Sequence, residues 1–387
     1  MNKRTLILLL ALIISLAANL SPVQAQSGLT VLSNSPEAEY PDKLTFNLSA
    51  SSNVDVTDIR LCYTINRSSF AQVTSEIYVE FTPGTSISAQ WTMDMKKTGG
   101  LPPGSKVTYW WRVTDASGNK VETAPAQVPF DDTHHPWRSL SRGKITLLWY
   151  AGNESFAQEL LATAEQTLIR LASDTGAQLK QPVKLYIYAS AQDLRGTLIH
   201  PQEWTGGVAF TRFGIIAIGI APSQLDWGKR ATAHELAHLV TQQMTYNPYS
   251  GLPSWLNEGL SMYAEGLLGS TFVAQLDKAI AENRLISVRS LSSPFSAFRE
   301  ESALAYAQSY RLIEFLVGSY GQAKMLELLN TFREGASYDE ALERVYGFDM
   351  DGLDILWRES LTRLSRPALD KNMPTARVGQ WAVPVEI

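Results

Sequence analysis

A histidine pair at helical spacing is the part of the sequence best suited to chemistry. His234-Glu235-Leu236-Ala237-His238 lies within residues 231–245, a segment that has no glycine or proline and is rich in helix-forming residues. On a helix, residues four apart differ by about 40° around the axis, so both imidazoles project from one face as adjacent zinc ligands must. Glu235 is offset by about 100°, where its carboxylate can accept a proton from metal-bound water. We therefore predict a catalytic zinc site on this helix.

A third protein ligand is expected, because catalytic zinc takes three protein ligands and leaves the fourth position to water. The sequence has one cysteine and no histidine after His238, so a carboxylate is needed. Glu258 supplies one just inside a new helix that begins at Pro253, which a short connection folds back onto the first helix. Glu265, two turns later, would face the same way but lie about 10 Å along the axis. We predict that His234, His238 and Glu258 hold one Zn²⁺ per chain.

Two motifs in this region resemble those of the gluzincin metallopeptidases. His-Glu-Leu-Ala-His at 234–238 and Trp-Leu-Asn-Glu-Gly-Leu-Ser at 255–261 are similar to motifs of the aminopeptidase-like branch and its compact bacterial peptidase MA-like relatives. The resemblance extends over about residues 144–365. It implies that the two histidines and Glu258 bind zinc and that Glu235 is the general base.

The resemblance also implies a tyrosine that donates a hydrogen bond to the oxyanion of the tetrahedral intermediate. Tyr306-Ala307-Gln308-Ser309 matches the setting of this tyrosine in the family. Tyr306 lies on the inward face of a predicted helix whether or not it is catalytic, so a packing role for its ring stays open. Tyr310, one turn later, is the substitute candidate.

Two departures from the family pattern bear on function. The aminopeptidase branch has a Gly-x-Met-Glu-Asn segment whose glutamate holds the amino terminus of the substrate, whereas residues 206–210 read Gly-Gly-Val-Ala-Phe. Without this acid we expect an endopeptidase, and the resemblance implies that strand 215–220 is the edge to which an extended peptide adds. The usual acidic partner one turn after the third ligand is replaced by Met262, so Asn257 or Ser261 is expected to orient an imidazole instead.

Composition and charge exclude several other classes of protein. The 387 residues include 33 basic and 38 acidic side chains, which give a formal net charge of −5, and no basic run indicates binding to nucleic acid or an anionic membrane. The lone cysteine excludes an internal disulfide framework and a thiolate-rich metal site. A hydrophobic content of 45% is sufficient for packed cores.

The first 25 residues have the features of a secretory signal peptide. Lys3 and Arg4 form the charged start, residues 5–20 form an apolar run, and Val23-Gln24-Ala25 is a small-x-small cleavage site. The run of about 16 residues is shorter than the roughly 20 of a spanning helix, so cleavage after Ala25 is favoured over an uncleaved N-terminal anchor, which stays an alternative. We expect a secreted or extracytoplasmic protein without stable membrane insertion after cleavage.

The remaining chain divides into regions of different pattern. Residues 27–131 read as short strands of period two separated by turn clusters, which is typical of an immunoglobulin or fibronectin type β-sandwich. Residues 140–365 alternate strands and helices and then become helical, and the resemblance implies a thermolysin-like α/β domain with a mixed sheet and a helical lobe. Residues 366–387 read as a C-terminal tail. We therefore predict a multidomain protein.

These features together predict an exported zinc metallopeptidase that hydrolyses bonds in a peptide or protein substrate. Two alternatives stay open, namely a non-catalytic metal-binding or scaffold protein of the cell surface and a metal-dependent hydrolase of a non-peptide bond. The intact Glu235 argues against the first alternative, because a site that only binds metal has no need of a base.

Overall fold

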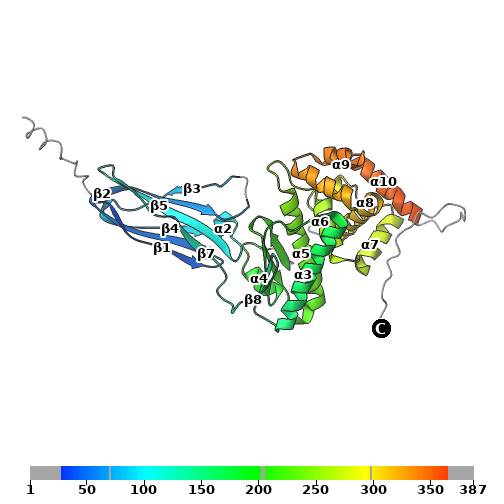
Figure 1. The fold of residues 1–387 in the computed structure, drawn as a ribbon, viewed down its shortest axis with the longest axis horizontal. Helices are drawn as coiled ribbons and strands as arrows, with labels where there is room; N and C mark the ends of the chain where they lie inside the picture. The colour runs from blue at the N-terminus through cyan, green and yellow to red at the C-terminus, as the bar shows by residue number, and fades with distance from the viewer. Residues whose placement is uncertain (1–27, 69–70, 202–204, 297–298, 365–387) are drawn as a thin grey trace, which may run out of the picture. The chain divides into compact units, whose positions relative to one another are not determined.

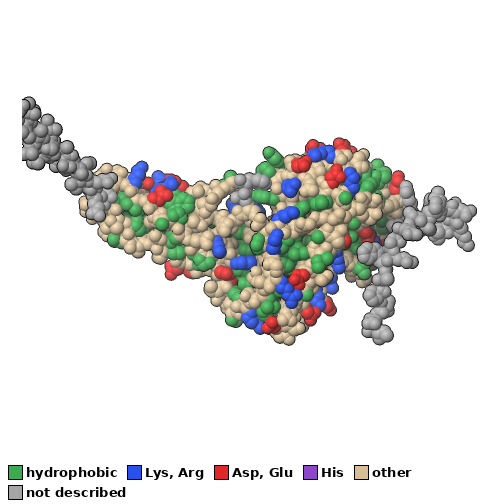
Figure 2. Space-filling model, viewed as in Figure 1, with side chains coloured by type: hydrophobic (Ala, Val, Ile, Leu, Met, Phe, Trp, Pro, Cys, Tyr) green, Lys and Arg blue, Asp and Glu red, His purple; other side chains and the backbone are tan. Residues whose placement is uncertain are grey.

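The computed structural model describes residues 28–68, 71–201, 205–296 and 299–364 (Figure 1). The expected signal peptide and C-terminal tail lie outside these ranges. The chain forms two compact units, one of residues 1–134 with 197–200 and one of residues 135–196 with 201–387. Within the described ranges, no helix combines the length and the apolar character that crossing a membrane requires. The face seen in Figure 2 carries interspersed basic and acidic side chains.

The first unit consists mainly of antiparallel strands. These are β1 (Thr30–Glu39), β2 (Lys43–Ile65), β3 (Ser75–Tyr78), β4 (Gly84–Asp94), β5 (Ser105–Asp115), β6 (Lys120–Glu122) and β7 (Ala126–Phe130), with a short helix α2 (Met95–Thr98) after β4. β2 is 23 residues long and pairs with β1 and β4 along its first part and with β3 and β5 along its second part. A register shift between Ser51 and Val56 separates the two parts.

The strand pairing of this unit differs from that of two separate sheets. The alternation expected in β5 is confirmed, because Val107, Tyr109, Trp111 and Val113 are all buried. Phe46, in the first part of β2, packs against Tyr109 with 4.8 Å between ring centroids. All seven strands nevertheless belong to one curled sheet, so the expected two-sheet sandwich is not confirmed. The physical reason is that β2 continues through a bulge where a sandwich would begin a new strand.

The second unit contains a mixed five-stranded sheet. Its strands are β8 (Arg138–Arg142), β9 (Ile145–Trp149), β10 (Val183–Tyr188), β11 (Gly207–Phe210) and β12 (Ile215–Gly219), in the order β11-β12-β10-β9-β8. β9, β10 and β12 are parallel, whereas β8 and β11 pair antiparallel to their neighbours. The fully buried residues of β12 agree with its inner position, because inner strands of such sheets are covered on both faces.

The structure corrects the prediction of which strand lies at the edge of this sheet. Strand 215–220 was predicted to be the free edge, but β12 pairs with β10 on one side and with β11 on the other. The cause is a tight hairpin in which a 3₁₀ turn at Thr211–Phe213 and Gly214, at φ +66°, return the chain antiparallel to β11. β11 is therefore the edge strand of the described sheet on this side.

Helices make up most of the second unit. They are α3 (Glu154–Thr175), α4 (Ala191–Gly196), α5 (Leu225–Thr245), α6 (Ser254–Glu265), α7 (Ser270–Ala281), α8 (Arg299–Arg333), α9 (Tyr338–Tyr346) and α10 (Met350–Leu364). Asn153 caps the start of α3 by accepting a hydrogen bond from the Phe156 amide, and Gly176 ends it in the left-handed conformation. Gly321, at φ +82°, interrupts the helical geometry of α8.

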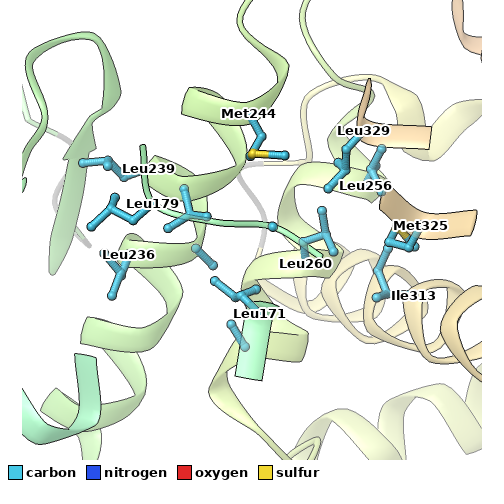
Figure 3. Packing of buried hydrophobic residues seen from close by; sticks show 14 of the residues in the cluster. Leu171, Leu179, Leu236, Leu239, Met244, Leu256, Leu260, Ile313, Met325 and Leu329 are labelled. Atoms are coloured by element: carbon cyan, nitrogen blue, oxygen red, sulfur yellow. The ribbon is translucent and has the colours of Figure 1, made fainter. Parts of the chain in front are cut away.

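One hydrophobic core joins the sheet to the helices of the second unit. Figure 3 shows part of it, with Leu256 and Leu260 of α6 beside side chains of α8, and Leu236 and Leu239 of α5 beside Leu179. Leu236 and Leu239 are fully buried on α5, and Leu256 and Leu260 are buried on α6. Because these leucines occupy the inward face of each helix, the polar residues of the two motifs are held in a fixed orientation on the remaining faces.

Helices α6 and α8 cross at Gly259, the residue after Glu258. A Cβ atom at this position would lie 2.5 Å from the Ser309 carbonyl oxygen and 2.8 Å from Ile313 Cγ1. Only glycine therefore allows the backbones to approach this closely. The crossing places the helix of Glu258 directly against the helix of Tyr306.

Gly259→Ala is expected to destabilise the protein, because the added methyl group forces the two helices apart. Overpacking of this kind costs roughly 1–3 kcal/mol, which urea unfolding monitored by circular dichroism would detect as a lower midpoint. Gly318→Ala in α8 is the matched control, since its Cβ would meet no atom within 4 Å. Alanine there should be neutral or stabilising by up to about 1 kcal/mol. Equal stability of Gly259→Ala and wild type would contradict the close crossing.

Candidate metal centre

α5 presents both predicted histidines on one face. Its opposite face carries Leu236, Leu239 and Val240, all fully buried in the core, and this fixes the rotation of the helix. The side chains of His234 and His238 remain 17% and 14% exposed, so a ligand can reach them. Their Nε2 atoms lie 3.2 Å apart. The structure therefore brings the two imidazoles together as the i, i+4 spacing predicted.

α6 brings Glu258 to the same point. Glu258 Oε2 lies 3.5 Å from His234 Nε2 and 3.4 Å from His238 Nε2. This oxygen atom is shielded from solvent, whereas the Glu258 side chain as a whole is 21% exposed. The three side chains form a group whose ligand atoms all lie within 4.8 Å of one another. The arrangement joins the three residues that the sequence analysis named as ligands.

The contact made by Nδ1 of His234 shows that this nitrogen carries a proton. His234 Nδ1 lies 2.8 Å from Glu265 Oε1. A carboxylate can only accept a hydrogen bond, so Nδ1 carries a proton, and the lone pair that a metal ion would bind is the one on Nε2.

The same reasoning applies to His238, through a hydroxyl. His238 Nδ1 lies 3.0 Å from Ser261 Oγ, and this hydroxyl lies 3.1 Å from the Asn257 carbonyl oxygen. A carbonyl oxygen is an acceptor only, so the Ser261 hydroxyl donates to it and accepts from His238 Nδ1. The Nε2 atom of neutral His238 therefore also presents a lone pair.

The donor set fits a zinc ion. Two imidazole lone pairs and a carboxylate oxygen converge, and they repel one another unless a cation lies between them. Zinc bonds of 2.0–2.2 Å in a tetrahedron separate neighbouring ligand atoms by roughly 3.3–3.5 Å. The observed separations of 3.2, 3.4 and 3.5 Å match this spacing. A nitrogen and oxygen donor set without thiolate is also one that zinc accepts.

The electrostatics favour a positive charge at the same place. Burial alone would lower the pKa of His234, but hydrogen bonding to the Glu258 and Glu265 carboxylates outweighs it and raises the pKa to about 10. Burial would raise the pKa of Glu258, yet contact with His234 and His238 lowers it to about 2. Protein groups thus bind a proton tightly here, and a metal ion supplies the same positive charge.

Glu265 is the functional residue that the sequence analysis missed. It was considered only as a ligand and set aside in favour of Glu258, yet its carboxylate orients His234. α5 and α6 run antiparallel, so a residue later in α6 meets a residue earlier in α5. The signal that could have found it is its position seven residues after Glu258, on the same face of the helix.

The expectation for Ser261 is confirmed, because its hydroxyl contacts His238 as described above. Asn257 takes part through its backbone carbonyl, which fixes that hydroxyl. Met262, at the position where relatives carry an acid, is buried.

Glu235 lies beside the two histidines and against the edge strand. A Cβ on Gly207, the first residue of β11, would lie 2.8 Å from Glu235 Oε1, so only glycine lets the strand approach the carboxylate this closely. Burial raises the pKa of Glu235, while the neighbouring imidazoles and a hydrogen bond with the Ala209 backbone oppose the shift. A carboxylate with a raised pKa accepts protons more readily than an exposed one, as a general base must.

The two candidate tyrosines occupy different surroundings. The ring of Tyr306 lies 6.4 Å from the ring of His234 and packs edge-on against Phe295 at 5.1 Å. Burial and the nearby carboxylates Glu258 and Glu235 raise the pKa of Tyr306, which keeps its hydroxyl protonated and able to donate. Tyr310 packs instead against Tyr263 at 5.9 Å. Of the two, Tyr306 is the one beside the candidate metal ligands.

Comparison with known proteins identified a family match and distant structural neighbours. The family model described as Peptidase MA superfamily matches residues 163–363, just over half of the chain. No curated protein matches the chain. An M1 zinc metallopeptidase from Deinococcus radiodurans is 14% identical over 86% of this chain and 94% of its own, with a TM-score of 0.36. Catalytically inactive OgpA from Akkermansia muciniphila, in complex with an O-glycopeptide, is 12% identical over 28% of this chain and 32% of its own, with a TM-score of 0.21.

Glu265→Ala is expected to weaken zinc binding, because His234 loses the acceptor that fixes its ring and its tautomer. Loss of such a partner typically costs 10- to 100-fold in metal affinity, measurable by competition with a chromophoric chelator. Glu282→Ala is a control, since this exposed glutamate bonds Arg284 near the end of α7. Unchanged zinc affinity in Glu265→Ala would show that this contact does not position the ligand.

Proposed function

The chain belongs to the Peptidase MA superfamily and is a zinc metallopeptidase, and on this premise we propose that it is an exported endopeptidase acting on peptide or protein substrates. The observation that carries the proposal is that two imidazoles and the Glu258 carboxylate converge on one point. The Glu235 carboxylate lies beside them, against the edge strand β11. Export rests on the signal-peptide pattern of residues 1–25.

His234, His238 and Glu258 would hold the zinc ion, with Glu265 and Ser261 keeping the two imidazoles in position. When bound there, zinc lowers the pKa of the attacking water and polarises the scissile carbonyl. Glu235 takes the proton of that water on its carboxylate and later gives it to the leaving nitrogen. Its buried position and raised pKa suit both halves of this transfer.

Tyr306 is proposed to donate its hydroxyl hydrogen to the oxyanion of the tetrahedral intermediate. Its place beside His234 and its raised pKa support this role. A donor aimed at developing negative charge in a site of low dielectric typically contributes 10²- to 10³-fold to the rate.

The edge strand β11 is proposed to bind the substrate backbone as an added strand. An edge strand presents unpaired backbone groups, and Gly207 brings this edge against the catalytic base. Backbone pairing of this kind does not select a chain terminus. The stretch 206–210 carries no acidic side chain that could hold a substrate amino group, which supports cleavage of internal bonds.

A metal-binding protein without turnover is disfavoured by the position of Glu235. The burial of a carboxylate is costly, and Glu235 is not one of the three side chains that converge as ligands. A role as proton acceptor accounts for its presence at this place.

Glu235→Gln is expected to keep stoichiometric zinc and lose cleavage of an unfolded protein by 10²-fold or more, because the amide cannot accept the proton. Zinc content is measured by atomic absorption and cleavage by release of fluorescent fragments. Tyr306→Phe should lower kcat by roughly 10²- to 10³-fold with a similar KM. Tyr310→Phe is the matched comparison and should retain most activity. Equal activity of wild type and Glu235→Gln would refute the proposed mechanism.

Blocking the substrate amino terminus separates the two modes of peptide cleavage. A peptide of about ten residues with an acetylated amino terminus should be cut at internal bonds as fast as the free peptide, because backbone pairing needs no terminal charge. Mass spectrometry of the products identifies the bonds. Cleavage limited to the first residue of the unblocked peptide would show an aminopeptidase instead.

A further inference from the structure

Trp227 lies on the same face of α5 as the zinc-binding histidines. It precedes His234 by seven residues, which places it about 20° from His234 around the helix and about 10 Å along it. Its side chain is one of the large apolar ones left exposed, at 38%. The intervening turn on this face holds the exposed Arg230 and the half-buried Ala231. The indole is therefore separated from the metal ligands by one turn that has a small residue on one side.

The residue that precedes the edge strand packs against this indole. A Cβ on Gly206 would lie 3.1 Å from Trp227 Cη2 and 3.2 Å from Cζ2, tighter than most real contacts. The next residue, Gly207, approaches Glu235 in the same way. Two consecutive glycines thus bring the backbone against the indole and against the base, one residue apart, or about 3.8 Å along the chain.

The spacing assigns the indole to one position of a bound peptide. Antiparallel pairing is slightly the more stable way to add a strand, and a peptide paired antiparallel to β11 runs opposite to it. Going from Gly207 to Gly206 along the protein therefore corresponds to going one residue toward the C-terminus along the substrate. Since Gly207 contacts the base Glu235 and Gly206 contacts Trp227, the indole lies beside the substrate residue that follows the scissile bond.

We propose that Trp227 forms one wall of the subsite for the residue immediately after the scissile bond and selects large apolar or aromatic side chains there. The proposal rests on the endopeptidase function proposed above and names the class of its substrate. The exposed face of the indole offers dispersion and aromatic contacts to a large apolar side chain. Segments of unfolded protein that are rich in Phe, Leu or Tyr are the substrates with this chemistry.

The test is a series of blocked peptides that differ only in the residue after the scissile bond, with Phe, Leu, Ala or Asp at that position. Wild type should show kcat/KM for Phe roughly 10-fold or more above that for Ala. In Trp227→Ala this ratio should fall to about 1, whereas kcat/KM for the Ala peptide should change little. Trp227→Phe should restore the preference, because it replaces the aromatic wall.

Two further variants complete the design. Gly206→Ala displaces the indole without removing it and should lower the same ratio. Tyr249→Ala, which removes an aromatic side chain that is 79% exposed and lies close to Gly335, is the control and should leave the ratio unchanged. Melting temperatures of all variants show whether each is folded, and Gly206→Ala or Trp227→Phe carries the test if Trp227→Ala is not.

The outcomes separate this inference from the function on which it rests. Wild-type protein that binds zinc but cuts none of the peptides refutes the endopeptidase. Cleavage with the same Phe to Ala ratio in wild type and Trp227→Ala overturns the role of Trp227 alone. A change of preference confined to the residue before the scissile bond overturns the antiparallel placement of the substrate and with it the subsite assignment.

Discussion

The candidate site depends on two imidazole nitrogens that face each other at 3.2 Å. Each ring is held with its proton on the far nitrogen, by Glu265 in one case and by Ser261 in the other. The facing lone pairs repel, and Glu258 adds a third negative centre within 3.5 Å of both. Positive charge is favoured at this point, as a proton on His234 or as a metal ion, so the packing of the surrounding helices prepares a cation site.

The core maintains this geometry against the repulsion. The leucines on the inward faces of α5 and α6 fix how the helices are rotated, and Gly259 lets α6 lie against the backbone of α8. The same crossing sets the distance between Glu258 on one helix and Tyr306 on the other. The proposed ligand and the proposed oxyanion donor, from distant parts of the sequence, are thereby placed by a single close contact. On the other side of α5, Gly206 and Gly207 let the edge strand approach in a similar way.

The sequence predicted those parts of the site whose positions depend on residues close to one another in the chain. The positions of His234, Glu235 and His238 follow from helical periodicity, and Glu258 follows from a short connection between two helices. Glu265 was missed as a partner of His234 because that pairing depends on how two antiparallel helices align, which no single helix specifies.

The fold was also predicted only in part. The pattern predicted strands and helices followed by a helical region, and the family resemblance implied that the sheet is mixed; the structure contains both the mixed sheet and the helical region. The edge strand was assigned wrongly, because a hairpin through Gly214 reverses which strand is outermost. In the first unit the inward and outward alternation was correct, but the continuity of β2 through its bulge could not be read from a period of two.

Three carboxylates surround the histidines, and their environments give them different tasks. Glu258 touches both imidazoles, and its lowered pKa keeps it anionic, as a metal ligand must be. Glu265 is paired with a ring proton and acts on the metal only through His234. Glu235 lies partly buried beside the strand, and the same imidazoles that lower the pKa of Glu258 do not offset the effect of burial on the pKa of Glu235. When neighbouring carboxyl groups are driven apart in pKa, the one that holds a proton more readily is suited to proton transfer. This division follows from the burial and contacts of each group, and it assigns Glu235 to the chemistry independently of its place in a motif.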